Sequence, residues 1–97
     1  MKYIKNILTI DKIPLNKVAK KYGTPAYCYS FSELKNNIKQ FKNNFKGINP
    51  LICFSVKSNS NRRILQEIKN FNIGADVVSK GELIKAIKSG IKPSKIV

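Results

Sequence analysis

The sequence predicts an α/β fold in which short parallel strands alternate with amphipathic helices. Three observations predict this class. Apolar residues recur at helical spacing in four segments, short apolar runs without that period follow these segments, and glycine, proline and capping residues separate the two kinds of segment. The length of 97 residues allows one small domain, and the hydrophobic content of 42% is typical of a globular chain.

The first predicted helix covers residues 14–22, where apolar side chains repeat at helical spacing between Pro14 and Gly23. Thr24-Pro25 then favours extended backbone. The aromatic-rich run 26–29 has no helical period, so it predicts a buried strand.

A second helix is predicted to begin at Ser30, because Ser30-Phe31-Ser32-Glu33 has the spacing of a capping box. We expect it to end before Gly47. Its apolar stripe is expected to face the core. The stripe consists of Leu34, Ile38, Phe41 and Phe45.

The nearly continuous apolar run 51–56 predicts a strand that is covered on both faces, as in a parallel sheet. Lys57 follows it directly, and the polar residues 58–61 predict a turn. The next helix is predicted to begin near Asn61 or Arg62 and to be ended by Gly74.

The last predicted segments repeat the alternation. Residues 75–78 predict a short strand, and Ser79-Lys80-Gly81-Glu82 is a second capping box that opens a helix reaching Gly90. Ile96-Val97 begins another strand after Pro93. This order predicts βαβ units around a parallel sheet.

The net charge of +14 would attract nucleic acid or an anionic membrane surface. The basic residues are scattered lysines, however, and the only basic pairs are Lys20-Lys21 and Arg62-Arg63. This distribution is typical of a solvated surface, so no membrane and no specific nucleic acid is expected as a partner. A non-catalytic basic module that binds nucleic acid stays open as an alternative.

The two cysteines, Cys28 and Cys53, lie in strand-like runs without the spacing of a metal site or a disulfide framework. We expect reduced cysteines in the core and no metal. Charged residues interrupt any apolar segment near Met1, and no stretch is long enough to span a bilayer. A cytoplasmic location is therefore the expectation.

Active residues of parallel α/β folds collect where strands end and the following loops begin. Lys57 and Asp76 hold such positions. A lysine beside a buried strand would be partly desolvated, which favours the neutral amine that forms a Schiff base. Position alone favours a solvated surface lysine for Lys57, a turn residue for Asp76 and a capping residue for Glu82. Asn59 and Asn61 suit turn and capping roles.

Three ordered motifs resemble those of diaminopimelate decarboxylases. Residues 22–29, YGTPAYCY, resemble the opening YGTP-x-Y-V-Y, and residues 54–59, FSVKSN, are similar to the Y-A-V-K-A-N strand. Residues 74–82, GADVVSKGE, are similar to G-x-D-V-V-S-x-G-E, and residues 86–97 look like the pattern A-x-x-A-G-x-x-P-x-x-I-V. The resemblance covers nearly the whole chain after Ile13.

The resemblance implies the amino-terminal part of a pyridoxal-phosphate-binding (β/α)8 TIM barrel of the alanine-racemase type, incomplete in this chain. Residues 14–97 would supply the first βα units, and residues 1–13 would belong to a second β domain. The implied reaction of the complete enzyme, the last step of lysine biosynthesis, is decarboxylation of meso-diaminopimelate to L-lysine in a cytoplasmic homodimer. The fragment alone would be inactive. Related ornithine/arginine-type decarboxylases share part of the motifs and are the alternative.

By the same resemblance, Lys57 is the catalytic lysine that holds pyridoxal 5'-phosphate as a Schiff base, and Asp76 and Glu82 lie around the cofactor. The departures from the motifs are small: Ser55 and Ser58 replace alanines, and Cys28 replaces a β-branched residue. The family's phosphate-binding glycine loop and substrate-binding arginines are expected beyond Val97.

Overall fold

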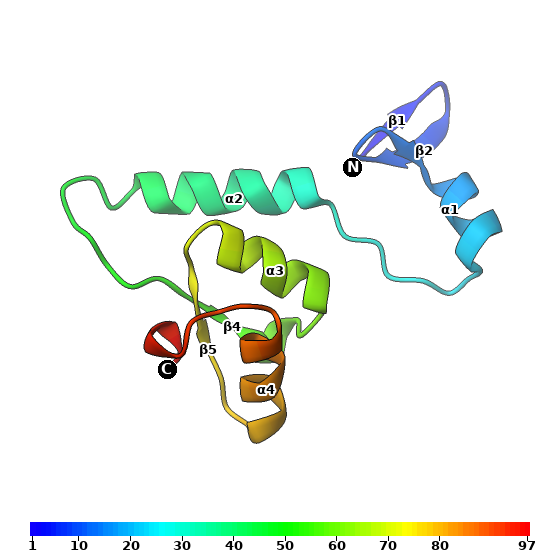
Figure 1. The fold of residues 1–97 in the computed structure, drawn as a ribbon. Helices are drawn as coiled ribbons and strands as arrows, with labels where there is room; N and C mark the ends of the chain where they lie inside the picture. The colour runs from blue at the N-terminus through cyan, green and yellow to red at the C-terminus, as the bar shows by residue number, and fades with distance from the viewer. The chain divides into compact units, whose positions relative to one another are not determined.

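The computed structural model describes residues 1–97, which form two units, Met1–Lys39 and Gln40–Val97 (Figure 1). The first unit contains β1 (Lys2–Ile4), β2 (Ile7–Ile10), β3 (Ile13–Pro14), α1 (Leu15–Tyr22) and the beginning of α2 (Phe31–Asn43). The second contains the end of α2, β4 (Cys53–Ser55), the 3-10 helix η1 (Val56–Ser58), α3 (Arg62–Asn70), β5 (Gly74–Asp76), α4 (Lys80–Lys88) and the 3-10 helix η2 (Pro93–Lys95). None of the helices is long and apolar enough to cross a membrane.

The first unit begins with an antiparallel sheet in the order β1-β2-β3, which the sequence reasoning did not predict. Both turns have two residues with positive φ, at 48° and 61° for Lys5-Asn6 and at 50° and 67° for Asp11-Lys12. Positive φ at both positions is the type I′ geometry that suits tight hairpins. Asparagine and aspartate tolerate positive φ, so Asn6 and Asp11 were the signal in the sequence for these two turns.

The helix predicted over residues 14–22 is confirmed as α1. It ends where expected, because Gly23 has a φ of 83° and its backbone N–H donates to the carbonyl of Ala19 at 2.8 Å. Glycine adopts this left-handed conformation without the steric cost that a Cβ would bring.

The prediction of a buried strand over residues 26–29 is wrong for this structure. The residues between Gly23 and Ser30 form neither helix nor strand, and Tyr27 is 93% exposed. Cys28 is also exposed, which corrects its assignment to the core. Extended, aromatic-rich backbone becomes a strand only where a neighbouring strand takes its hydrogen bonds, and no strand of the structure pairs with this segment.

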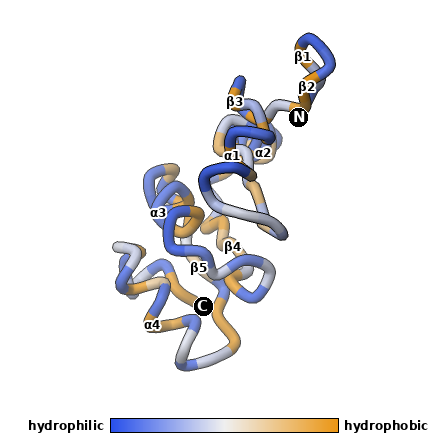
Figure 2. Tube along the Cα trace, turned by 90° about the vertical axis from the view of Figure 1, so that its right-hand side faces the viewer, coloured by the Kyte–Doolittle hydropathy of each residue, from blue (hydrophilic) through white to orange (hydrophobic).

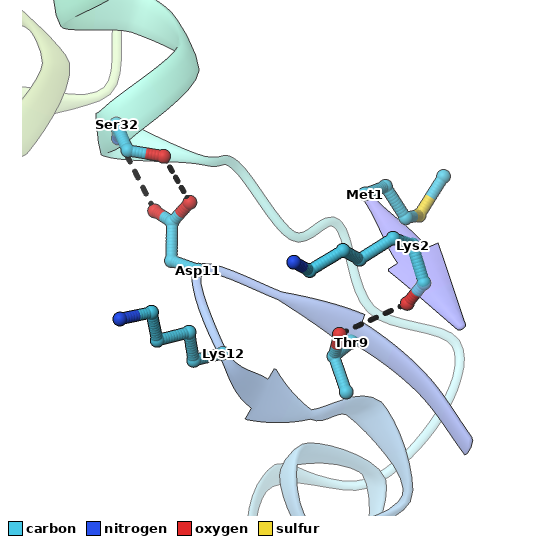
Figure 3. Close-up of a pocket in the computed structure, with 6 residues that line it drawn as sticks. All are labelled: Met1, Lys2, Thr9, Asp11, Lys12 and Ser32. Atoms are coloured by element: carbon cyan, nitrogen blue, oxygen red, sulfur yellow. Dashed lines mark hydrogen bonds between the residues drawn. The ribbon is translucent and has the colours of Figure 1, made fainter. Parts of the chain in front are cut away.

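The start of α2 agrees with the prediction, since Ser30 Oγ accepts a hydrogen bond from the Glu33 backbone N–H at 3.1 Å. A carboxylate from the turn between β2 and β3 also accepts hydrogen bonds from this end of the helix (Figure 3). Asp11 accepts from Ser30 Oγ at 2.6 Å, from Ser32 Oγ, and from the Ser32 backbone N–H at 3.2 Å. A negative charge is favourable at a helix N-terminus, so Asp11 ties the β2–β3 turn to α2.

These bonds predict an acid-sensitive contact. The Ser30 hydroxyl, followed by that of Ser32, lowers the pKa of Asp11 from 3.8 to about 2. Because the folded pKa lies below the unfolded one, the contribution of Asp11 to stability is complete above 3.8 and is lost as the pH falls through about 2. We expect the Asp11 carboxyl to titrate near 2 by NMR, and Ser32→Ala to move the midpoint upward. A midpoint at the ordinary value in the unmodified protein would contradict the contact.

The second unit contains the predicted parallel sheet. β4 pairs with β5 in the register Cys53↔Gly74, Phe54↔Ala75 and Ser55↔Asp76. Ile96 joins β5 through a parallel bridge to Ala75, so the strand expected at the end of the chain is present as a bridge. Both strands differ from their predicted bounds, because only the paired residues form strands. β4 covers three residues of the predicted strand 51–56, and β5 begins one residue before the predicted strand 75–78 and ends at Asp76.

The core of the second unit lies between this sheet and the helices that follow its strands. Its buried apolar residues come from η1, α3, β5, α4 and the connections between them; they are Val56, Ile64, Leu65, Ile68, Ile73, Ala75, Ala86 and Ile91. Figure 2 shows the hydrophobic run through β4 and the alternation of hydrophilic and hydrophobic residues along α3. The amphipathic pattern of α3 therefore packs as predicted.

The prediction for the helix that begins near Asn61 or Arg62 needs correction at its end. Gly74 does not end α3 but is the first residue of β5, while the left-handed residue after the helix is Asn72, with a φ of 61°. Gly74 is required for another reason, because a Cβ there would lie 2.2 Å from the Lys95 carbonyl oxygen and 2.9 Å from Cys53 Sγ. The glycine allows β5 to approach its neighbours closely.

The apolar stripe of α2 is only partly core-facing. Ile38 is buried and Leu34 half-buried, but Phe41 is 53% exposed. Phe41 and Phe45 instead contact each other edge to face, with ring centroids 5.2 Å apart. Such a pair retains aromatic contact without full burial.

A buried hydroxyl at the end of α4 leads to a stability prediction. Ser89 is 6% exposed, and its Oγ has no hydrogen-bond partner. Since an unsatisfied buried hydroxyl costs about 1–3 kcal/mol, Ser89→Ala is expected to raise the free energy of unfolding by about 1 kcal/mol. Urea unfolding measures the change, with the exposed Ser94→Ala as the matched control. Destabilisation by Ser89→Ala alone would mean that the hydroxyl has a partner.

Candidate functional site

The carboxyl ends of β4 and β5 bring Ser55 and Asp76 together. The two residues are directly paired in the parallel register, and both are half-buried. Ser55 Oγ donates a hydrogen bond to Asp76 Oδ2 at 2.7 Å. The other carboxylate oxygen, Oδ1, accepts no hydrogen bond and remains available to a positively charged group.

Lys57 lies in η1, the short turn that continues from β4. The turn is closed by a hydrogen bond from the Asn59 backbone N–H to the Val56 carbonyl at 3.1 Å. A second bond runs from Ser58 Oγ to the Ser55 carbonyl at 2.7 Å. Val56 is fully buried, whereas Lys57 is exposed. The backbone of this lysine is therefore anchored while its amine is accessible.

The environment of Lys57 differs from the sequence-based expectation in one respect. Its side chain is exposed, so the partial desolvation expected from its position is absent in these 97 residues. The amine forms no hydrogen bond and no ion pair. It is not bonded to Asp76 or Glu82, although η1, β5 and α4, which carry the three residues, belong to the same unit.

Glu82 has a structural contact in the turn between β5 and α4. Its Oε2 accepts from the Val78 backbone N–H at 3.0 Å, and its own backbone N–H donates to Ser79 Oγ at 3.2 Å. The capping role predicted for Ser79 is therefore confirmed, with the Glu82 carboxylate reaching one residue beyond the helix cap. Glu82 fixes the loop that follows Asp76.

Asn61 has the capping role that the sequence favours. Its side chain accepts from the Arg63 backbone N–H at 2.9 Å, and Asn59 Oδ1 accepts from the Asn61 backbone N–H at 3.0 Å. These bonds set the start of α3 directly after the Lys57 turn. The two asparagines thus shape the loop around Lys57.

Cys53 lies two residues before Ser55 and is not a reactive group. Burial, followed by the negative charge of Asp76, raises the pKa of the Cys53 thiol. A thiol held in its neutral form is a poor nucleophile and a poor metal ligand. No group of three or more metal-binding side chains is present elsewhere in the chain. Lys57 and Asp76 are therefore the side chains at this end of the sheet that could take part in a reaction.

Sequence reasoning missed the bond that Ser55 makes. A signal for it was present, because Ser55 is the one hydroxyl side chain within an otherwise apolar strand. Buried polar groups are almost always hydrogen-bonded, so a partner on the neighbouring strand was to be expected.

This arrangement suits a cofactor that carries an aldehyde. Lys57 offers a primary amine without a partner, and the free oxygen of Asp76 can accept from, or pair with, a cationic group. The residues present thus fit the aldehyde end of such a cofactor, which is the end that bonds to an amine. The chain offers no glycine-rich loop for a phosphate group.

Comparison with known proteins identifies the kind of chain to which this site belongs. Residues 31–97 match the family described as pyridoxal-dependent decarboxylase, pyridoxal binding domain. A curated relative, diaminopimelate decarboxylase of Helicobacter pylori, is 49% identical over 76 residues, which are 78% of this chain and 19% of the relative.

Two solved structures resemble the chain closely. A protein of Aquifex aeolicus matches 98% of this chain and 23% of its own, with a TM-score of 0.91 and 36% identity. Diaminopimelate decarboxylase of Helicobacter pylori, solved in complex with L-lysine, matches 84% of this chain and 21% of its own, with a TM-score of 0.79 and 40% identity. The resemblance drawn from the motifs and the predicted fold class, the amino-terminal part of a pyridoxal-binding barrel, are thereby confirmed. The chain spans about a fifth of the length of its curated relatives.

Proposed function

Because this chain belongs to the family of pyridoxal-dependent decarboxylases, as part of their pyridoxal binding domain, we propose that Lys57 holds the cofactor in an enzyme that decarboxylates meso-diaminopimelate to L-lysine. The observation that carries the proposal is the position of Lys57. Its amine is exposed and unpaired, on an anchored turn at the carboxyl end of β4. Pyridoxal phosphate is the cofactor of the family.

The residues around Lys57 have separate tasks in this proposal. When bound, the cofactor supplies an aldehyde that bonds to amines and a ring that accepts the electrons of the breaking carbon–carbon bond. Lys57 would hold the aldehyde end of the cofactor through Nζ, and the same amine could donate or accept a proton. Asp76 would orient the cofactor through its free oxygen, and Glu82 holds the loop that follows Asp76.

The choice of substrate rests on the relatives. Several relatives named diaminopimelate decarboxylase are 33–49% identical to this chain. The Helicobacter pylori enzyme has been solved with L-lysine, the product that the proposed reaction releases. An ornithine/arginine-type decarboxylase is the competing assignment within the family.

Peptide mapping tests the role of Lys57. The protein is expressed from its natural gene, loaded with pyridoxal phosphate, reduced with borohydride and digested. We expect the reduced cofactor on the peptide that contains Lys57. Label on another lysine would overturn the assignment of the site, whatever the substrate.

A substrate panel tests the reaction. Carbon dioxide release is measured with meso-diaminopimelate, ornithine and arginine at equal concentrations. Preference for meso-diaminopimelate is the expected result. Preference for ornithine or arginine would favour the competing assignment while leaving the role of Lys57 intact.

The assembly, location and second domain are also part of the proposal. We expect the complete enzyme to be a cytoplasmic homodimer in which residues 1–13 join a β domain. The antiparallel β1-β2-β3 sheet at this end of the chain supports the β assignment. Analytical ultracentrifugation of the natural gene product measures the dimer, and a monomer at micromolar concentration would contradict it.

A further inference from the structure

We propose that Ser55 is a positioning residue, which holds the Asp76 carboxylate in the orientation needed for cofactor binding at Lys57. This inference rests on the proposed function and adds a residue to it. It starts from the hydrogen bond between Ser55 Oγ and Asp76 Oδ2, 2.7 Å long and partly buried.

The sheet fixes where both side chains start. Ser55 and Asp76 are the last paired residues of β4 and β5, directly opposite each other in the parallel register. Neighbouring strands lie about 4.8 Å apart, and paired residues point to the same face of the sheet. Backbone pairing therefore places a hydroxyl and a carboxylate within bonding distance on that face.

The hydroxyl restricts a group that would otherwise rotate. A carboxylate with neither oxygen bound can turn about its side-chain bonds. An O–H···O⁻ bond is among the stronger hydrogen bonds of proteins, so Ser55 selects one orientation of Asp76. In that orientation Oδ2 is occupied and Oδ1 is free for a ligand.

The same serine also takes part in the turn that carries Lys57. The Ser55 carbonyl accepts from Ser58 Oγ at 2.7 Å, and this bond spans Lys57. Ser55 thus contacts Asp76 through its side chain and the Lys57 turn through its backbone. A single residue links the carboxylate to the turn.

The interaction is a property of this sequence. The motif that residues 54–59 resemble has alanine where Ser55 and Ser58 stand, and alanine has no hydroxyl to donate. A chain with the alanine of the motif could not orient Asp76 by a side-chain hydrogen bond from this position of β4.

The test compares variants in the protein expressed from its natural gene. Pyridoxal phosphate is added at increasing concentrations, and the rate of its capture by Lys57 is followed by visible absorbance and by borohydride trapping. We expect Ser55→Ala to weaken or slow capture by about tenfold, the typical effect of losing a hydrogen bond to a charged group. Ser94→Ala, at an exposed position of η2, is expected to leave capture unchanged.

A matched pair separates the hydroxyl from the packing of the strand. Ser55→Thr and Ser55→Val have nearly the same shape, but only threonine keeps the hydroxyl. We expect threonine to retain capture within about twofold and valine to lose it as alanine does. This comparison applies even if Ser55→Ala folds poorly, because both β-branched residues favour strands.

A double-mutant cycle shows whether Ser55 acts through Asp76. In the Asp76→Ala background, Ser55→Ala is expected to cause no further loss of capture. Equal losses in both backgrounds, or equal capture by the threonine and valine variants, would overturn the inference. Failure of the unmodified protein to capture the cofactor at Lys57 would instead overturn the proposed function.

Discussion

Replacement of Lys57 by alanine is expected to abolish cofactor capture and to lower decarboxylation by a factor on the order of 10³ or more, as loss of a covalent catalytic group does. The physical reason is that alanine has no amine to bond to the cofactor aldehyde. Lys57 is exposed on an anchored turn, and its amine is free of hydrogen bonds and ion pairs. Absorbance of the bound cofactor and carbon dioxide release measure the two effects.

The many lysines of this chain make a matched control essential. Lys92 is exposed in the connection between α4 and η2, away from the strand ends that carry the site. Lys92→Ala removes the same charge and is expected to leave capture and activity unchanged. Lys57→Arg keeps the charge but not the nucleophile, so it should behave as Lys57→Ala does. Retained capture in Lys57→Arg would show that charge alone is required.

Replacement of Gly74 by alanine is expected to destabilise the protein by about 3 kcal/mol or more, at the upper end of overpacking effects. The new Cβ would lie 2.2 Å from a backbone oxygen, that of Lys95, which cannot move without shifting the chain. It would also lie 2.9 Å from Cys53 Sγ. Thermal and urea unfolding of the natural gene product measure the loss.

Gly81 provides the control for this substitution. A Cβ at Gly81 would have Ser79 Oγ as its nearest neighbour, at 3.9 Å. Because Gly81 lies in the first turn of α4, Gly81→Ala is expected to be neutral or to stabilise by about 0.5–1 kcal/mol. Equal effects of the two substitutions would show that β5 does not pack as closely as the structure indicates.

The elements of the second unit were largely predictable because their signals are local. Asn61 and Ser79 cap the helices that the sequence places after them, and their side chains need only the next few backbone N–H groups. The position of Lys57 at the end of an apolar run was equally readable. The role of Lys57 and its cofactor required the three ordered motifs, because position alone does not distinguish it from a surface lysine.

Errors arose where the outcome depends on distant residues. The run 26–29 has the composition of a strand, yet Tyr27 is 93% exposed, since no strand of the structure pairs with this run. Gly74 looked like a helix end, whereas the approach of Lys95, 21 positions further on, explains it.

The sequence by itself determined the α/β alternation, the helix starts and the lysine that ends the first long apolar run, because periodicity, capping and motif order act between residues close in the chain. Only the tertiary structure decided that Ser55 donates to Asp76, since β4 and β5 must first pair in one register. Strand register is set by packing between segments, and a shift of one residue would turn Asp76 to the other face.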